Sequence, residues 1–241
     1  MEQKTSHIES QNKVLERTNQ MLEEFAYVVA HDLREPLRSI ISFTNLLEKT
    51  NGHRFDENAK TYMDFIVKSG KHMNNLLVDL LQYTTIDKNE IEKHEVNVNE
   101  IVSDINFLLS AAIEQTNAVI IFNDLPNVYA NDTHIKQLFQ QLIHNAMKFI
   151  KKDISPIIRI SCIEKESYFH FSVQDNGIGI GADYLDKIFK IFNRLDKKNY
   201  QGTGIGLAIC QKIARMYGGK IWVESVEGEG STFHFTIEKA K

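Results

Sequence analysis

The sequence of 241 residues predicts an α+β protein in two parts, a helical-hairpin domain followed by an α/β-sandwich domain. Three observations predict this. In the first third, apolar residues recur at intervals of four and three, which is typical of helices that pack on other helices. Residues 87–95 are charged and have no apolar period. Beyond them, short β-rich runs alternate with helical stretches.

The N-terminal segment has the pattern of a coiled-coil helix. Its apolar and amide positions are Ile8, Asn12, Leu15, Asn19, Leu22, Ala26, Val29 and Leu33. Asn12 and Asn19 fall at a positions, where a buried Asn lowers stability but favours a defined register and two strands. The alternative is one amphipathic helix packed within a monomer. We expect a parallel dimeric helix.

The next segment predicts a helical hairpin. His31 falls at an outward f position with Asp32 beside it, and Pro36 removes a backbone donor, which should kink the helix. Residues 50–55 predict a turn, and Asp56 is suited to cap a second helix. The repeating positions of that helix are Ala59, Met63, Ile66, Gly70, Met73, Leu77, Leu80 and Thr84. Two such hairpins across a dimer axis would form a four-helix bundle.

The remainder of the chain predicts an α/β sandwich. The expected strands are 118–122, 157–163, 168–173, 220–225 and 231–237, and the expected helices are 99–115, 132–150 and 204–217. Tight turns between neighbouring strands favour antiparallel pairing with the helices on one face.

The composition excludes several classes of partner. A net charge of −4 gives no electrostatic reason to expect nucleic acid or an anionic membrane as a partner. No apolar run approaches the ~20 residues that cross a bilayer, and the polar N-terminus is unlike a signal peptide. Cys162 and Cys210 lack metal-ligand spacing, so we expect buried thiols in a reducing, cytoplasmic environment.

A polar face on the 132–150 helix is the first candidate site. Asn145 and Lys148 are three residues apart and share this face. An amide oxygen can bind Mg²⁺, and a lysine ammonium can bind a phosphate. A solvated helix face is the alternative for this segment alone.

Two glycine clusters follow. In residues 175–181, Asp175 could accept a hydrogen bond from an adenine amino group, while Gly177 and Gly179 permit positive φ and close approach to a ligand. The cluster also fits part of the dinucleotide fingerprint. This match is a weak indication, because the strand before it looks like part of a hairpin and not of a βαβ unit. The 202–208 cluster opens into a helix, whose N-terminus can bind phosphate. No Walker A pattern occurs.

These motifs, in this order, resemble the catalytic core of sensor histidine kinases of two-component systems. The resemblance runs from about Leu22 to Ile237, includes all five sequence boxes, and in residues 31–37 is closest to the phytochrome-like and PAS-linked branch. It implies an ATP-binding domain of the GHKL (Bergerat) type. The domains would be a coiled-coil signalling helix (1–22), a dimerisation and histidine phosphotransfer domain (23–88), a linker (89–95) and the catalytic ATP-binding domain (96–241).

The resemblance also implies roles for individual residues. His31 would be the phosphoacceptor, attacking through Nε2 while Asp32 holds and deprotonates the Nδ1 side. The implied ATP-site residues are Asn145, Lys148, Phe149, Asp175, Gly177, Gly179, Arg194, Gly202, Thr203, Gly204, Gly206 and Thr232, with Asn145 as the Mg²⁺ ligand. For Phe149 and Thr232 a packing role is the alternative. Residues 187–201 would form a lid over ATP.

Two positions depart from the family pattern. Gln141 stands where the family often has a second Asn, which leaves the metal surroundings open. Glu35 stands four residues after the histidine, where many relatives carry Thr or Asn. A carboxylate there would repel both hydroxide and an aspartyl phosphate, so we expect phosphatase activity on the partner regulator to be weak or absent.

The implied partners are a second copy of the chain, the receiver domain of a response regulator and an upstream sensor domain. We expect no nucleic acid partner and no membrane contact within this chain. Three other functions are alternatives: a chaperone-type or mismatch-repair ATPase, an anti-sigma-type serine kinase, and a scaffold that dimerises without catalysis. The first two lack a phosphoacceptor helix, and the ATP-site residues disfavour the third. The sequence leaves open the signal, the regulator, whether the full-length protein is membrane-bound, and whether each histidine is phosphorylated in cis or in trans.

Overall fold

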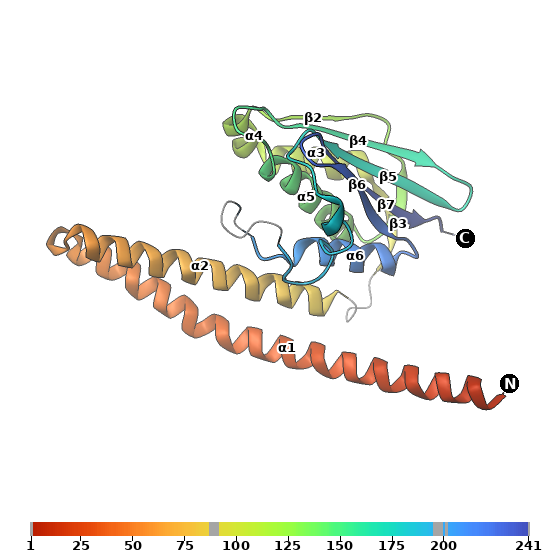
Figure 1. The fold of residues 1–241 in the computed structure, drawn as a ribbon, viewed down its shortest axis with the longest axis horizontal. Coiled ribbons are helices and arrows are strands. Elements are labelled where there is room, and N and C mark those ends of the chain that lie inside the picture. The colour runs from red at the N-terminus through yellow and green to blue at the C-terminus, as the bar shows by residue number, and fades with distance from the viewer. Residues whose placement is uncertain (1, 87–91, 195–199, 201, 241) are drawn as a thin grey trace. The chain divides into compact units, whose positions relative to one another are not determined.

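The computed structural model describes residues 2–86, 92–194, 200 and 202–240, with side chains for residue 21 and from residue 26 onward (Figure 1). The chain divides into two compact units, Met1–Lys88 and Asn89–Lys241. Among the described residues, no helix is both long enough and apolar enough to cross a membrane.

The first unit is a helical hairpin. The long helix α1 (Glu2–Asn51) is followed by the short 3-10 helix η1 (Gly52–Arg54) and by α2 (Glu57–Thr85). Asp56 caps α2 as expected, because its Oδ1 accepts a hydrogen bond of 2.7 Å from the Ala59 amide. Helix α1 continues through Pro36 as one element. The Asn and apolar positions expected from Ile8 to Leu22 lie outside the described side chains.

The two helices pack closely where α2 carries a glycine. Ala30 and Leu37 of α1 and Met63 and Val67 of α2 are buried. A Cβ on Gly70 would lie 2.7 Å from Ile41 Cγ1, closer than real Cβ contacts come. The glycine therefore sets the distance between α1 and α2 at this level of the hairpin.

The second unit begins with β1 (His94–Asn97), α3 (Val98–Leu108) and α4 (Ser110–Thr116). It continues with β2 (Val119–Phe122), β3 (Asn127–Ala130), α5 (Asp132–Lys148), β4 (Ile157–Glu164) and β5 (Tyr168–Asp175). The 3-10 helix η2 (Ala182–Tyr184), α6 (Gly206–Met216), β6 (Ile221–Val226) and β7 (Gly230–Glu238) complete it.

The strands form two sheets. The main sheet has the order β2-β4-β5-β7-β6, parallel between β2 and β4 and antiparallel elsewhere. Its helix-facing side meets α5 through Phe139, whose ring packs edge-on against Phe171 of β5 and Phe235 of β7. The helices α3, α5 and α6 lie on this side of the sheet (Figure 1). This is the α/β sandwich that the sequence predicts.

Three features differ from the sequence-based expectation. The helix expected at 99–115 is two helices, because the chain leaves α-helical geometry at Leu109 (φ −94°, ψ 6°). The antiparallel pair β1 and β3 was not expected. Strand β1 also takes in residues 94 and 95 of the expected linker, of which residues 89–91 lie outside the described part. Short strands of four residues carry too few side chains to show a clear alternation.

Candidate functional site: a buried carboxylate, a glycine loop and an exposed histidine

His31 lies on the exposed surface of α1. Its Nδ1 is 3.1 Å from Asp32 Oδ1, and the two side chains are 68% and 72% exposed. When Nδ1 carries the proton, it donates to the carboxylate, and Nε2 is then the nitrogen with a free lone pair. This arrangement suits an imidazole that acts as a nucleophile through Nε2.

In the second unit, Asp175 is held in a fixed orientation at the end of β5. Its Oδ1 accepts backbone hydrogen bonds from Gly177 (2.8 Å) and Ser231 (3.1 Å). Burial raises the pKa of the Asp175 carboxyl, and these two hydrogen bonds oppose the shift. The described part of the chain provides no partner for Oδ2, which leaves this oxygen able to accept from an amino group of a ligand.

The glycines beside Asp175 are required by close backbone approach. A Cβ on Gly177 would lie 2.4 Å from the Phe149 carbonyl oxygen. Gly179 has a φ of +70°, and a Cβ there would lie 2.0 Å from the Val226 carbonyl oxygen. Both glycines therefore let the segment after β5 pack against the end of α5 and the end of β6.

The polar face of α5 lies beside the second glycine loop. Asn145 is only 8% exposed, and its Oδ1 accepts a hydrogen bond of 3.0 Å from Gln141 Nε2. A Cβ on Gly202 would lie 2.7 Å from Lys148 Nζ, so the loop passes next to this ammonium. Partial burial lowers the pKa of Lys148, and the nearby positive charge of Arg194 lowers it further. An anion bound at this position would relieve that repulsion.

The glycine loop leads directly into α6. The Ile205 amide donates to Thr203 Oγ1 at 3.3 Å, and Gly204 has a φ of +75°. The Gly204 carbonyl accepts a hydrogen bond of 2.9 Å from the Phe192 amide. No side chain of the described residues caps the start of α6 at Gly206, so its first backbone amides remain available to an anion.

Phe149 ends α5 and is covered by aromatic and cationic groups. Its ring centroid lies 4.9 Å from that of Tyr200 and 4.5 Å from Lys148 Nζ. Arg194 Nη2 donates to the Tyr200 carbonyl oxygen. Tyr200 was not expected from the sequence, which offered no periodic pattern in the 187–201 segment. Residues 195–199 and 201 of the expected lid lie outside the described part.

The structure does not place the expected residue Thr232 on the side of the sheet that faces the helices. Side chains alternate along β7, and Phe233 and Phe235 face the helices, so Ser231 shares their side and Thr232 faces the other. Ser231 was missed from the sequence. It is 7% exposed, its amide donates to Asp175, and its hydroxyl lies 2.9 Å from the Ser225 hydroxyl.

The donor chemistry of this site fits Mg²⁺ held mainly by a nucleotide. Among the described residues no group of three or more His, Cys, Asp or Glu side chains could hold a metal. Asn145 supplies an amide oxygen from a buried position on α5, and its hydrogen-bond partner Gln141 lies against the start of α6. Mg²⁺ commonly keeps several waters and takes one or two protein oxygens together with substrate phosphates, so one protein oxygen is sufficient.

Comparisons with known proteins identify the family. Residues 21–89 match the His Kinase A (phospho-acceptor) domain, and residues 130–241 match the histidine kinase-, DNA gyrase B- and HSP90-like ATPase. The phytochrome-like protein Cph1 of Synechocystis sp. is 42% identical over 224 residues, which cover 92% of this chain and 30% of that protein. The chain thus spans about a third of the length of its phytochrome relatives.

Two solved structures extend the comparison. The catalytic domain of the histidine kinase ThkA is 33% identical, with a TM-score of 0.54 over 62% of this chain and 97% of that chain. ThkA in complex with the response regulator TrrA is 28% identical, with a TM-score of 0.65 over 97% of this chain and 66% of that chain. The chain therefore belongs to the sensor histidine kinases, and carries the phosphoacceptor and ATP-binding domains of their catalytic core.

Proposed function

We propose that this chain is an ATP-dependent autokinase that phosphorylates His31 and passes the phosphoryl group to an aspartate of a response regulator. The observation that carries the proposal is the state of His31, exposed and held at Nδ1 by Asp32 at 3.1 Å. The ATPase-family match of residues 130–241 supplies the nucleotide-binding domain that such a histidine needs. Without the exposed histidine of the first unit, the ATPase-family domain of the second unit would fit a simple ATPase equally well.

The reaction follows from the chemistry of these groups. The Nε2 lone pair of His31 attacks the γ-phosphorus as the bond to the β-phosphate oxygen breaks, and ADP leaves. The imidazole becomes cationic, and Asp32 stabilises it and accepts the Nδ1 proton. We propose that Lys148, Arg194 and the α6 amides hold the phosphates, and that Asp175 Oδ2 accepts from the adenine amino group. Mg²⁺ bound with ATP would neutralise phosphate charge beside Asn145.

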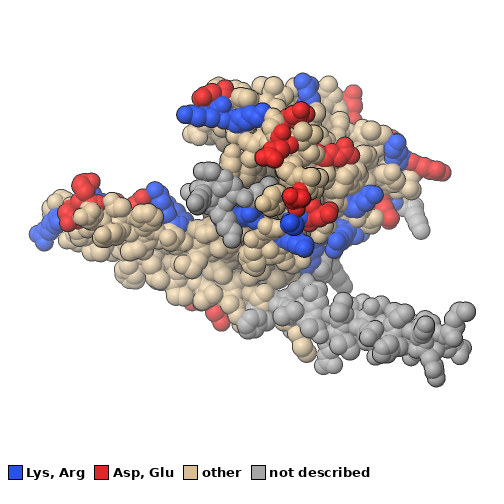
Figure 2. Space-filling model, in the orientation of Figure 1, with Lys and Arg blue, Asp and Glu red and all other residues tan. Residues whose placement is uncertain are grey.

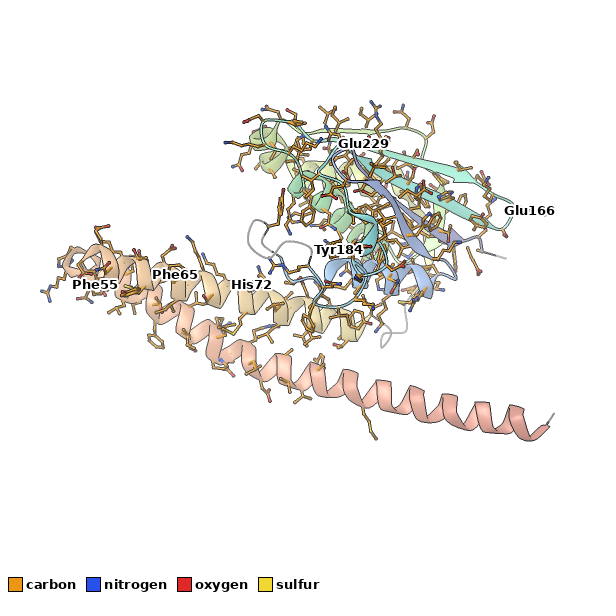
Figure 3. The ribbon with its side chains drawn as sticks, viewed as in Figure 1. Phe55, Phe65, His72, Glu166, Tyr184 and Glu229 are labelled. Atoms are coloured by element: carbon orange, nitrogen blue, oxygen red, sulfur yellow. The ribbon has the colours of Figure 1, made fainter. Side chains whose placement is uncertain are left out.

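We further propose that the active form is a homodimer through the hairpin. Large apolar side chains are exposed on both helices: Val28, Leu33, Ile40, Phe43 and Leu47 on α1, and Tyr62, Phe65, Ile66 and Met73 on α2. Figure 2 shows few charged side chains on the visible face of the hairpin away from its turn. Figure 3 shows Phe65 on α2, where the residue is 66% exposed. An apolar surface of this extent is typical of an interface.

The partner of the phosphorylated histidine would be a receiver domain. ThkA, a relative, forms a complex with a response regulator. An upstream sensor domain belongs to the same proposal, since the relatives are much longer than this chain. The expected cytoplasmic location is likewise part of the proposal. The domain roles expected for 1–22, 23–88, 89–95 and 96–241 also remain proposals.

The direct test is to incubate the chain with Mg²⁺ and γ-labelled ATP beside a His31→Gln variant. We expect label that is stable in alkali and lost in acid, present only when His31 is intact. Nucleotide binding with no label on either protein would refute the autokinase and favour the scaffold. Label that persists in His31→Gln would refute His31 as the acceptor.

A further inference from the structure

Gln141 contacts both parts of the site that would meet the phosphates and the metal. It lies one turn before Asn145 on α5, and its Nε2 donates a hydrogen bond of 3.0 Å to Asn145 Oδ1. Its carboxamide also lies against the start of α6. A Cβ added to Gly206 would come within 2.3–2.6 Å of the Gln141 carboxamide atoms. One side chain thus bridges the Asn-bearing helix and the glycine loop.

The hydrogen bond determines which way the Asn145 amide points. An asparagine amide can present either its oxygen or its NH₂ group in a given direction, and only the oxygen binds a cation. Because Gln141 donates and lies against Gly206, Asn145 Oδ1 is turned toward the side of α5 where the glycine loop begins α6. A carbonyl oxygen has two lone pairs, so one remains for a metal ion. In the described part of the chain, Asn145 Nδ2 has no hydrogen-bond partner that would hold the amide instead.

We propose that Gln141 is a positioning residue that orients Asn145 Oδ1 for the Mg²⁺ of bound Mg·ATP. This inference rests on the proposed function. The role needs a donor at residue 141, which an amide supplies and a carboxylate or a hydrocarbon does not. It also explains why α6 begins with Gly206, because any larger residue would displace the carboxamide. Groups that orient metal ligands typically change metal affinity by about 10–100-fold when they are removed.

The test separates metal binding from nucleotide binding and does not use kinase activity. Calorimetry gives the affinity for ADP in Mg²⁺ and in EDTA, and the ratio of the two is the Mg²⁺-dependent gain. Gln141→Met keeps a similar unbranched volume and removes the donor. We expect it to reduce the gain by about tenfold while leaving the affinity in EDTA unchanged. Gln140→Met is the matched control, because Gln140 is the adjacent residue and exposed; its gain should equal that of the unsubstituted chain.

A double-mutant cycle gives a second criterion. In an Asn145→Ala background, Gln141→Met should have no further effect on the gain, because the ligand it orients is absent. Equal losses in Mg²⁺ and in EDTA would refute the proposal and assign Gln141 a packing role. The proposal would also be refuted if the Mg²⁺-dependent gain were the same in Gln141→Met as in the unsubstituted chain. Nucleotide binding without any Mg²⁺-dependent gain in the unsubstituted chain would instead refute the metal role of Asn145 in the proposed function, and Gln141 with it.

One measurement does not depend on the variant folding. In the unsubstituted chain with saturating ADP, the side-chain NH₂ resonances of Gln141 should shift when Mg²⁺ is added, because its acceptor then binds the metal. The resonances of Gln140 should not shift. Unchanged Gln141 resonances under conditions where Mg²⁺ tightens ADP binding would overturn the proposal.

Discussion

Replacing Asp175 with Asn tests the proposed contact between Asp175 Oδ2 and the adenine amino group. The two oxygens of the carboxylate differ: Oδ1 accepts from the Gly177 and Ser231 amides, while Oδ2 has no hydrogen-bond partner among the residues that the structure describes. An asparagine has one acceptor and one donor in the same place. If its oxygen keeps the two backbone amides, its NH₂ meets the adenine NH₂, donor against donor. If the amide rotates, its NH₂ meets the two backbone amides instead.

The magnitude follows from that mismatch. Either orientation leaves at least one buried donor unsatisfied, which costs about 1–3 kcal/mol. We therefore expect Asp175→Asn to weaken ATP binding by roughly 5- to 150-fold, at about 1.4 kcal/mol for each factor of ten. Guanine carries an oxygen where adenine carries the amino group, so the same NH₂ can donate to it. The ratio of ATP to GTP affinity should consequently fall further than the ATP affinity alone.

The assay is calorimetric titration of ATP and GTP into the unsubstituted chain, Asp175→Asn and Asp183→Asn. Asp183 is exposed in η2 and serves as a charge-matched control. Thermal unfolding of each variant establishes that the fold is retained. An Asp175→Asn chain that is folded and keeps both the ATP affinity and the ATP-to-GTP ratio would refute the assignment of Oδ2 to adenine.

Three further predictions address other parts of the molecule. Gly70→Val should lower the free energy of unfolding by about 1–3 kcal/mol through overpacking, as measured by urea unfolding. Adding Ile41→Ala should recover part of this loss, and an unchanged free energy of unfolding in Gly70→Val would contradict the close contact in the hairpin. Glu35→Thr should raise the rate at which the chain dephosphorylates a phosphorylated regulator, and appreciable Glu35-dependent dephosphorylation by the unsubstituted chain would contradict the expectation. Burial lowers the pKa of His234, so the unfolded state binds more protons and the free energy of unfolding should fall as the pH drops below the ordinary histidine value of about 6.5. Unfolding can be followed by the fluorescence of Trp222, which is the single tryptophan of the chain and stacks on His234 at 5.1 Å between ring centroids. If His234→Asn has the same dependence of stability on pH as the unsubstituted chain, His234 is not the cause.

The fold could be predicted largely from periodicity. The long helices and the strands β4 to β7, which have six to nine residues each, carry enough side chains for their apolar spacing to be clear. The four-residue strand β2 was predicted instead from its continuous apolar run, Val119–Phe122. The pair β1 and β3 could not be predicted in this way, because each has four residues and their pairing joins segments separated by α3, α4 and β2. The end of α3 at Leu109 was missed for a different reason. Residues 99–115 contain neither Gly nor Pro, so no residue type marks the break.

Some residues of the candidate site could be proposed from the order of the sequence motifs, but contacts between distant segments could not. Asn145, Lys148, Asp175 and the glycines could be proposed because each motif has a chemical reason for its residue type, and the structure brings Lys148 beside Gly202. The contact of Gln141 with Gly206 joins residues 65 positions apart, and no sequence pattern in either segment predicts it. Tyr200 illustrates the same limit, since its ring contact with Phe149 joins residues 51 positions apart.

The positions of Ser231 and Thr232 differ for a simple geometric reason. Adjacent residues of a strand face opposite sides of the sheet, so Ser231 lies on the helix-facing side and Thr232 on the other side. The alternation of β7 was visible in the sequence, but the side that faces the helices is settled by partners in distant segments, namely Phe139 on Phe235 and the Ser231 amide on Asp175. The same two contacts join β7 to the core and to Asp175. The register that buries the core therefore also brings the Ser231 amide to Asp175, so core packing and the orientation of the Asp175 carboxylate depend on one alignment of β5 with β7.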